Sequence, residues 1–337
     1  MLNKTIAIMT SGGDSPGMNA AVWAAVKSAC SRGMTILGIR RGYQGLIDGD
    51  MIELTSESVL DVHNRGGTVL KTARCLRMKT EEGRAAALES CKRHGIEGLI
   101  VIGGDGSYQG AAVLASRGVP TIGLPGTIDN DLAYTDFTLG YDTASNTACH
   151  AALLVRDTME SHERIGIVEV MGRHCGDIAL NVAMATGADY VLVPEVEYSD
   201  PFDIKNLADR LCTLHDRGQT HFLVILAEGV NFENNHRAFA LRVALEAELN
   251  RRNVKMGEIR ETVLGYQQRG GHPTVADINL AVQMADHAVE LLERGVGNRA
   301  VGIRMNRIFD MDILEALQVP RQFNRNLYDM VQRLASV

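Results

Sequence analysis

The sequence centres on the stretch Thr121-Ile122-Gly123-Leu124-Pro125-Gly126-Thr127-Ile128-Asp129-Asn130-Asp131. Its apolar start, 121–124, predicts a buried strand that Pro125 and Gly126 end. In extended backbone, alternate side chains share a face, so we expect Thr127, Asp129 and Asp131 to point together. Ligands of parallel α/β sheets bind beyond the carboxyl ends of the strands, where this segment lies. The same residues are equally typical of an Asp- and Asn-rich turn.

Strands followed by glycine loops and helices recur on both sides of this stretch. Apolar runs predict buried strands at 5–9, 35–39, 99–102, 165–170, 190–193, 222–227 and 300–303. Helices are expected after the first loop as far as residue 32, and at 79–94, 143–162, 203–217, 237–253, 275–294 and 325–335. Strands that alternate with helices imply an α/β fold with parallel sheets and right-handed crossovers.

Length and composition limit the function classes. The 337 residues exceed what one hydrophobic core usually supports, so two domains are expected. A net charge of −7 argues against nucleic acid or an anionic membrane surface as the main partner. The six cysteines form no CxxC pair, which favours reduced thiols over disulfides or a zinc site. Because no apolar run approaches a membrane span and no secretion signal is evident, a cytoplasmic protein is expected.

Two glycine loops carry an acidic residue each. Thr10-Ser-Gly-Gly-Asp-Ser-Pro-Gly-Met-Asn19 follows the first strand, an arrangement that presents backbone N–H groups to a phosphate. Ile102-Gly-Gly-Asp-Gly-Ser107, with Gly110 beyond it, is one residue longer than the dinucleotide fingerprint, so a nicotinamide-dependent dehydrogenase is weakly supported. Asp105 in such a loop suggests a divalent metal on a phosphate, although a capping Asp in a tight turn is the alternative.

Charged residues follow nearly every predicted strand in this way. A surface location is the usual explanation for any one of them, but it explains the whole set poorly. Acids beside a phosphate loop, with arginines supplied separately, fit phosphoryl transfer to a phosphorylated acceptor. The charged residues in the loops that follow the predicted strands are Asp14, Asp105, Asp129, Asp131, Arg173, Glu228 and Arg269.

The two glycine loops, Pro125-Gly-Thr-Ile-Asp-Asn-Asp131, Val168-Glu-Val-Met-Gly-Arg173 and Gln268-Arg-Gly-Gly271 together resemble the motifs of the ATP-dependent 6-phosphofructokinase family. The resemblance covers essentially the whole chain. It implies two doubly wound, three-layer α/β domains with mostly parallel sheets and an active site in the cleft between them. An ATP-binding domain is expected at 1–140 plus 257–304, and a fructose-phosphate-binding domain at 141–256 plus 305–337.

The implied reaction is the glycolytic transfer of a phosphoryl group from Mg-ATP to the C1 hydroxyl of fructose 6-phosphate, which gives fructose 1,6-bisphosphate and ADP. Asp129 matches the family's general base, and Asp105 matches a ligand of Mg²⁺. The other expected catalytic residues are Thr127, Arg173, Gly12 and Arg74. The expected nucleotide-binding residues are Gly12, Tyr43, Arg74, Cys75, Gly104, Asp105, Gly106, Ser107 and Gly110.

The sugar-phosphate site implied by the resemblance involves a second subunit. In the family, the equivalents of Arg164 and Arg260 reach in from a neighbouring subunit, so a homotetramer with shared active sites is expected. The matching positions for the sugar phosphate are Thr127, Asp129, Asp131, Arg164, Met171, Gly172, Arg173, Glu228, Arg260, Tyr266 and Arg269.

Three departures from the family pattern stand out. Tyr266 occupies a position that is usually His, and a phenol donates one hydrogen bond but carries no positive charge. Lys71-Thr72 replace the commoner Gly-Ser before Arg74. In allosteric relatives a second, cationic site between subunits binds ADP or phosphoenolpyruvate. Lys27 alone keeps a positive charge among the matching positions here, which are Trp23, Lys27, Asp50, Leu154, Asp189, Gln219 and Thr220.

Two alternatives to this function remain. Pyrophosphate-dependent enzymes of the same fold typically carry Asp at the position of Gly106 and Lys at that of Gly126. Glycine at both positions leaves open the space that the Asp and Lys side chains would occupy, which favours ATP as the phosphoryl donor. A catalytically silent homologue that binds sugar phosphate or nucleotide as a regulatory subunit is disfavoured by the intact Asp129, Asp105 and Arg173.

Overall fold

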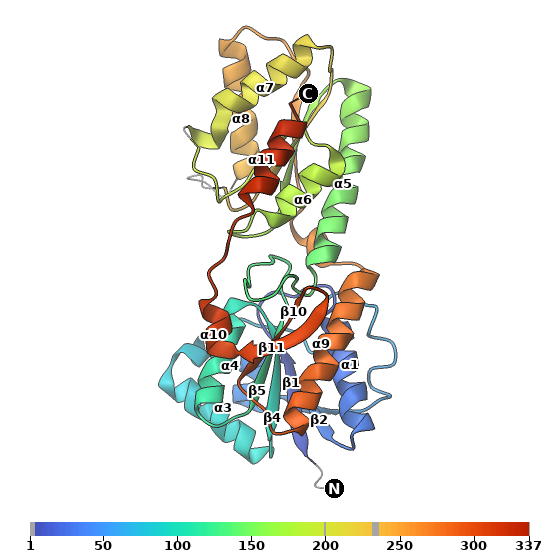
Figure 1. Ribbon diagram of the computed structural model, residues 1–337, viewed down its shortest axis with the longest axis vertical. Helices are drawn as coiled ribbons and strands as arrows, with labels where there is room; N and C mark the ends of the chain where they lie inside the picture. The colour runs from blue at the N-terminus through green and yellow to red at the C-terminus, as the bar shows by residue number, and fades with distance from the viewer. Residues whose placement is uncertain (1–3, 199, 231–235, 337) are drawn as a thin grey trace. The chain divides into compact units, whose positions relative to one another are not determined.

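The computed structural model describes residues 4–198, 200–230 and 236–336, and the chain divides into two compact units (Figure 1). Unit 1 comprises Met1–Thr143 and Arg269–Arg321. Unit 2 comprises Ala144–Gln268 and Gln322–Val337. Each unit is an α/β structure with its own sheet, as the alternation of strands and helices predicted.

Unit 1 is built on a seven-stranded sheet in the order β11-β10-β5-β4-β1-β2-β3. The five strands from β10 to β2 are parallel to one another, whereas β3 and β11 pair antiparallel at the two edges. The sequence pattern predicted the parallel centre and missed both edge strands. The strands are β1 (Thr5–Thr10), β2 (Thr35–Ile39), β3 (Met51–Leu54), β4 (Gly98–Gly103), β5 (Thr121–Pro125), β10 (Arg299–Arg304) and β11 (Arg307–Asp312).

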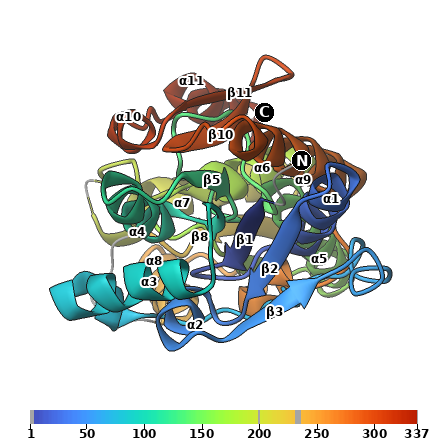
Figure 2. The same ribbon diagram turned by 90° about the horizontal axis from the view of Figure 1, so that it is seen from below.

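Helices bury both faces of this sheet, so that its central strands read as continuous apolar runs. In β1, Ile6 and Ile8 join the core formed with α1 (Met18–Ser31) and α9 (Val275–Glu293). Ala7 and Met9 point to the other face and join a second core. Figure 2 shows α1 and α9 on one side of the sheet and α3, α4 and α10 on the other. The helices of this second face are α2 (Gly42–Asp48), α3 (Glu81–Arg93), α4 (Asp105–Ser116) and α10 (Ile313–Gln318).

Unit 2 contains a four-stranded parallel sheet in the order β7-β8-β6-β9. Its strands are β6 (Ile165–Val170), β7 (Tyr190–Leu192), β8 (Phe222–Ala227) and β9 (Ile259–Val263). Its helices are α5 (Tyr141–His162), α6 (Asp177–Thr186), α7 (Ile204–Asp216), α8 (Arg237–Arg251) and α11 (Arg325–Leu334). Short 3₁₀ turns lie at η1 (Leu76–Lys79) in unit 1, at η2 (Pro201–Asp203) in unit 2, and at η3 (Gly265–Arg269), which ends at the first residue of unit 1's second segment.

The expected domain boundaries at 257 and 305 need correction. Residues 257–268 belong to unit 2 because β9 pairs with β6, in the register Ile165 to Ile259. Residues 305–321 belong to unit 1 because β11 pairs with β10 and α10 packs against α4. The partner of β9 lies far away in the sequence, whereas β11 pairs with the strand directly before it, across a two-residue turn.

No described helix combines the length and the hydropathy that a membrane span requires. All six cysteines are free thiols, as their scattered spacing predicted.

Candidate active site

The carboxyl ends of β1, β4 and β5 bring three loops of unit 1 to one edge of the sheet. Thr10 pairs with Ile102, and Gly103 pairs with Pro125, so the loops leave the sheet side by side. The Ser11 N–H donates to the Ile102 carbonyl (2.9 Å), and the Gly126 N–H donates to the Gly103 carbonyl (3.1 Å). The two glycine loops and the Asp129 segment, which are far apart in the sequence, therefore form one site.

The space between these loops suits an anion. A Cβ atom on Gly12 would lie 3.5 Å from Ser107 Oγ, and one on Gly104 would lie 3.7 Å from Thr127 Cβ. Helix α4 begins at Asp105, within the second glycine motif. The start of a helix exposes unpaired backbone N–H groups and the positive end of the helix dipole, which together favour a phosphate.

Asp105 has the surroundings that a metal ligand needs. Its side chain is exposed in the first turn of α4, and Oδ2 accepts one hydrogen bond from Gln109 Nε2 (2.8 Å). A carboxylate has about four acceptor positions, so this bond leaves capacity for a cation. Mg²⁺ is usually held by one or two carboxylates together with phosphate oxygens and water. Asp105 therefore has the free acceptor capacity that would let it hold Mg²⁺.

A hydrogen bond of Thr72 links the segment that contains Arg74 to the first glycine loop. Thr72 Oγ1 donates to the Gly12 carbonyl (2.7 Å), and Thr10 Oγ1 donates to the Lys71 carbonyl (3.0 Å). Lys71 itself has a left-handed φ of 57°, a conformation that glycine adopts at less cost. The Thr that replaces the family's Ser keeps the hydroxyl required for the bond to Gly12. Arg74 is exposed and lies two residues after this attachment.

Tyr43 and Gly110 pack against each other next to the second glycine loop. The Tyr43 hydroxyl donates to the Ser107 carbonyl (2.6 Å), and the Tyr43 ring occupies the space that a Cβ on Gly110 would need. Burial raises the pKa of Tyr43 above its ordinary value, so the hydroxyl stays protonated as a donor. Cys75 lies beside this group, with Sγ 3.6 Å from Gln44 Oε1.

The segment after β5 is a bent turn, and the expectation of extended backbone there was wrong. The chain bends at Ile128 and Asp129, and Asn130 has a left-handed φ of 52°. Asn130 Oδ1 accepts from the Thr138 N–H (3.1 Å), and Thr138 Oγ1 donates to the Thr127 carbonyl (2.7 Å). These bonds to Thr138 hold the turn, so side-chain alternation does not apply along it.

Asp129 is buried within this turn, with 3% of its surface exposed. Its backbone N–H donates to Thr127 Oγ1 (3.2 Å), a contact within the turn. Asp131 is half-buried two residues further on. A buried carboxylate at the carboxyl edge of the sheet, next to the phosphate loops, is well placed to accept a proton from a bound hydroxyl.

Arg269 lies in unit 1, although the sequence grouped it with Arg164, Arg260 and Tyr266. Its Nη1 donates to the Asp14 carbonyl (3.0 Å) and fills the space beside Gly13. The guanidinium group has five N–H donors, so it keeps donors for a ligand. The structure thus places this arginine at the first glycine loop, 255 residues away along the chain.

In unit 2, β6 ends in the predicted sugar-binding loop Met171–Arg173. Gly172 and Arg173 have positive φ values of 147° and 52°, and side chains hold the loop in this shape. Glu228 Oε1 accepts from the N–H groups of Gly172 (3.1 Å) and Arg173 (2.7 Å). Gln268 Oε1 accepts from the Met171 N–H (2.8 Å). Sequence reasoning missed Gln268, although the Gln-Arg-Gly-Gly motif contains it.

Arg164 and Arg260 share one carboxylate in unit 2. Arg164 lies 3.0 Å from Glu258 Oε2, and Arg260 lies 2.7 Å from Glu258 Oε1. They come together because Arg260 is in β9, and its neighbour β6 begins directly after Arg164. Tyr266 is 86% exposed, so its phenol is accessible to a ligand.

Gly106 and Gly126 differ in the space around them. A Cβ on Gly106 would meet no atom within 4 Å, as expected. A Cβ on Gly126 would lie 2.7 Å from Ile102 Cγ2 and 3.0 Å from Met18 Cε. The expectation of open space at Gly126 was therefore wrong, because this residue directly follows β5 and packs under α1.

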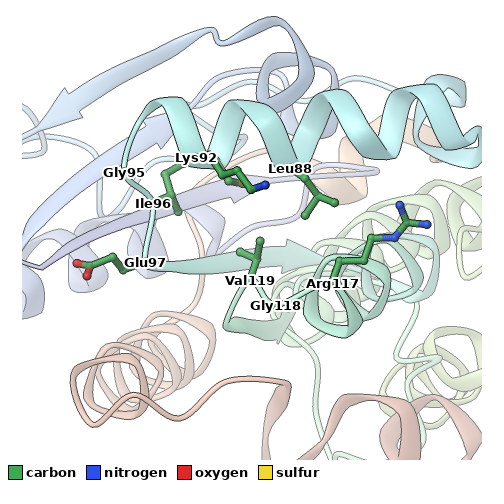
Figure 3. Close-up of a pocket in the computed structure, with 9 residues that line it drawn as sticks. Leu88, Lys92, Gly95, Ile96, Glu97, Arg117, Gly118 and Val119 are labelled. Carbon is green, nitrogen blue, oxygen red and sulfur yellow. The ribbon is translucent and has the colours of Figure 1, made fainter.

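A pocket of about 400 Å³ lies at the other edge of the unit 1 sheet (Figure 3). It is formed before the amino ends of β4 and β5, and Lys92 and Arg117 are among the residues that line it. Ligands of parallel sheets bind at the carboxyl ends of the strands, so this pocket is separate from the candidate active site.

Comparison with known proteins agrees with this geometry. The family model described as phosphofructokinase matches residues 5–292. An ATP-dependent 6-phosphofructokinase of Clostridium botulinum is 49% identical over 336 residues, which cover 98% of this chain and 99% of the relative. ATP-dependent 6-phosphofructokinase 1 of Clostridium perfringens is 48% identical over 331 residues, 98% of this chain and 99% of the relative.

Solved structures give the same fold. Phosphofructokinase from Saccharomyces cerevisiae superposes with a TM-score of 0.84 at 31% identity, over 98% of this chain and 47% of that one. A pyrophosphate-dependent phosphofructokinase from Nitrosospira multiformis superposes with a TM-score of 0.85, over 96% of this chain and 87% of that one. Its 20% identity supports the fold alone.

Proposed function

The chain belongs to the phosphofructokinase family, and from this premise we propose how its residues carry out the reaction. The reaction is phosphoryl transfer from ATP to the C1 hydroxyl of fructose 6-phosphate, which yields fructose 1,6-bisphosphate and ADP. The observation that carries this function is the identity of about half of all residues, over nearly the whole chain, with relatives named for this activity.

Unit 1 binds the donor. Gly12 and the loop from Gly104 to Ser107 hold the phosphates of ATP through backbone N–H groups, and Arg74 bridges the donor and the transferred phosphoryl group. Asp105 holds Mg²⁺, which neutralises charge on the phosphates when it is bound. The meeting of these loops at one sheet edge and the exposed carboxylate of Asp105 support these roles. Tyr43, Cys75 and Gly110 border the nucleotide site: Tyr43 and Gly110 shape the second loop, and Cys75 contacts Gln44.

Asp129 is the general base. It takes the proton of the C1 hydroxyl as the oxygen attacks the terminal phosphorus of ATP, with Thr127 and Asp131 beside it. Its burial and its place beyond β5, next to both glycine loops, support this role.

The acceptor is bound by residues that the sequence assigned to the sugar phosphate. Met171, Gly172, Arg173 and Glu228 bind the sugar, and the ordered Met171–Arg173 loop supports this assignment. The 6-phosphate is bound by Arg164, Arg260, Tyr266 and Arg269. Arginine suits this task because its planar fork binds phosphate oxygens through two parallel hydrogen bonds.

We further propose that the protein is a cytoplasmic homotetramer in which Arg164 and Arg260 serve the active site of a neighbouring subunit. Their shared bond to Glu258 holds the two guanidinium groups near each other within unit 2. Two preorganised cations lose little conformational entropy when they bind a phosphate.

Arg260→Ala is expected to weaken binding of fructose 6-phosphate about tenfold or more, because a hydrogen bond to a charged group contributes roughly 1.5–3 kcal/mol. Mixing this variant with Asp129→Asn protein should restore part of the activity, since Asp129 and Arg260 then come from different chains. Arg251→Ala is the matched control, because Arg251 pairs with Glu248 on the surface of the same unit. Mixed oligomers that form and stay inactive would place both groups in the site of one chain.

Insensitivity to ADP and phosphoenolpyruvate as effectors is a second expected result. Each charged position of the family's effector site has a partner within its own unit here. Asp50 pairs with Arg40 and Arg41, and Asp189 accepts from Gln219 Nε2 and from the Leu223 N–H. Lys27 donates to the Ser56 carbonyl (3.2 Å).

An effector shifts an equilibrium only through its different affinities for two states, and few cations are left here to bind a phosphate. Saturation curves for fructose 6-phosphate, measured with and without millimolar ADP or phosphoenolpyruvate, check this expectation. A several-fold shift of the half-saturation point with either compound would contradict it.

A coupled assay tests the proposed function as a whole. It offers ATP and pyrophosphate as donors, in parallel, against several sugar phosphates. We expect the highest kcat/KM with ATP and fructose 6-phosphate. Higher activity with pyrophosphate at matched concentrations, or no turnover with any donor, would overturn the proposal.

A further inference from the structure

Gln268 is a fully buried amide in an exposed segment. Its side chain has 0% exposed surface, whereas its neighbours Tyr266 and Gln267 in the turn η3 are both exposed. Burying a polar side chain is unfavourable unless its hydrogen bonds are made. The burial of Gln268 therefore calls for a specific partner.

That partner is the first residue of the acceptor-binding loop. Gln268 Oε1 accepts from the Met171 N–H (2.8 Å), across 97 residues of sequence. Glu228 Oε1 accepts from the next two N–H groups, those of Gly172 and Arg173. Three consecutive N–H groups are thus taken by two side chains, which leaves this loop little freedom.

The loop needs such support because its conformation is costly. Arg173 has a left-handed φ of 52°, which is unfavourable for a residue with a Cβ atom. Strained backbone of this kind persists only where the surrounding structure holds it. Glu228 holds the strained residues themselves, and Gln268 holds the point at which the loop leaves β6.

The orientation of the Gln268 amide is determined by Met171. Its oxygen must face the Met171 N–H, so its Nε2 faces away, and among the described residues this buried nitrogen has no hydrogen-bond partner. A buried donor without a partner destabilises the folded state.

We propose that Gln268 is a positioning residue for the acceptor: it fixes the Met171–Arg173 loop in the shape that binds the sugar phosphate. The inference rests on the proposed function, in which this loop holds fructose 6-phosphate. Gln268 acts on the substrate through the loop backbone.

The test compares Gln268→Met with Gln267→Met in the full-length oligomer. Methionine keeps the length of the side chain but has no amide oxygen. Losing the bond is expected to raise the KM for fructose 6-phosphate about fivefold to tenfold in Gln268→Met. The KM for ATP and the Tm should change little, since the variant also removes the unpartnered nitrogen. Gln267→Met should match the wild type in all three quantities.

Amide hydrogen exchange gives a direct readout of the loop. Residues 171–173 should exchange faster in Gln268→Met, whereas the loop after β5 should exchange as in the wild type. Gln268→Glu keeps an acceptor oxygen, so exchange at 171–173 should stay slow in that variant, and this measurement serves if the Met variant does not fold.

Other results would overturn the inference. They are an unchanged KM for fructose 6-phosphate in Gln268→Met, an equal rise of both KM values with a lowered Tm, and fast loop exchange in Gln268→Glu. The wild type is assayed in parallel with ATP and fructose 6-phosphate. An inactive wild type contradicts the proposed function, whereas an active wild type with an unaffected variant contradicts the role of Gln268 alone.

Discussion

Asp129→Asn is expected to lower kcat by about two to four orders of magnitude, the usual contribution of general acid–base catalysis. The substitution keeps the shape of the side chain and removes its basicity. Asp129 is buried at the end of β5, beside the loops that hold the donor in our proposal. The KM for ATP and the Tm should therefore stay close to those of the wild type.

Residues other than Asp129 hold the turn in shape. A loss of activity in Asp129→Asn would therefore report the loss of the base and not a change of the turn. Asn130 and Thr138 make the bonds that hold the turn. Asp136→Asn is the matched control, because Asp136 is an exposed acid of the same connection whose Oδ2 accepts from the Met305 N–H (2.8 Å). An Asn at position 136 can still accept this bond, so turnover should be unaffected.

Steady-state kinetics and thermal unfolding of both variants check this prediction. An Asp129→Asn enzyme that retained a third of the wild-type kcat would exclude Asp129 as the base. A large fall in Tm with nearly normal kcat would show instead that Asp129 shapes the turn.

Gly106→Asp is expected to lower kcat/KM for ATP about a hundredfold, since placing like charges together costs several kcal/mol. Gly106 lies in the first turn of α4, within the loop that binds the donor phosphates in our proposal. A Cβ at this position meets no atom within 4 Å, and its φ lies outside the left-handed region. The fold should therefore accept the new side chain, while the carboxylate projects toward the nucleotide.

Gly106→Asn separates charge from size. It should lose much less activity with ATP, because it fills the same volume without the negative charge. Assays with ATP and with pyrophosphate, at matched concentrations, should show the ratio of the two activities falling in the Asp variant alone. Equal losses in both variants would mean that steric crowding, and not charge, limits the nucleotide.

The space around Gly126 also bears on the comparison with pyrophosphate-dependent enzymes. The sequence indicated that a Lys could be placed there to serve pyrophosphate. The contacts of its Cβ position with Ile102 and Met18 show that this backbone would have to shift first. Core packing under the loop therefore limits which residues position 126 can accept.

The sequence by itself determined the main elements of the fold and the chemistry of the loops. The predicted strand at 165–170 matches β6, and Thr80 caps α3 (Glu81–Arg93) within the predicted helix at 79–94. These features are local: apolar periodicity, capping residues and glycine breaks lie within a few residues of one another. The loops at strand ends also followed, because parallel strands place their carboxyl ends at one edge.

The edge strands and the unit boundaries depended on the tertiary structure. β3 (Met51–Leu54) is only four residues long, and three of the six residues of β11 (Arg307–Asp312) are charged, so neither is predicted as a buried strand. β9 belongs to unit 2 because it pairs with β6. β6 and β9 are far apart in the sequence, and no local pattern records that they will pair.

Only the tertiary structure decided which side chains meet. Gln268 bonds to Met171 across 97 residues, and Arg269 bonds to Asp14 across 255, so two neighbouring residues serve loops in different units. The left-handed turn at Asn130 likewise depends on Thr138, which folds back onto it. Residue types determine which bonds are possible, whereas sheet order and chain crossings bring donor and acceptor within bonding distance.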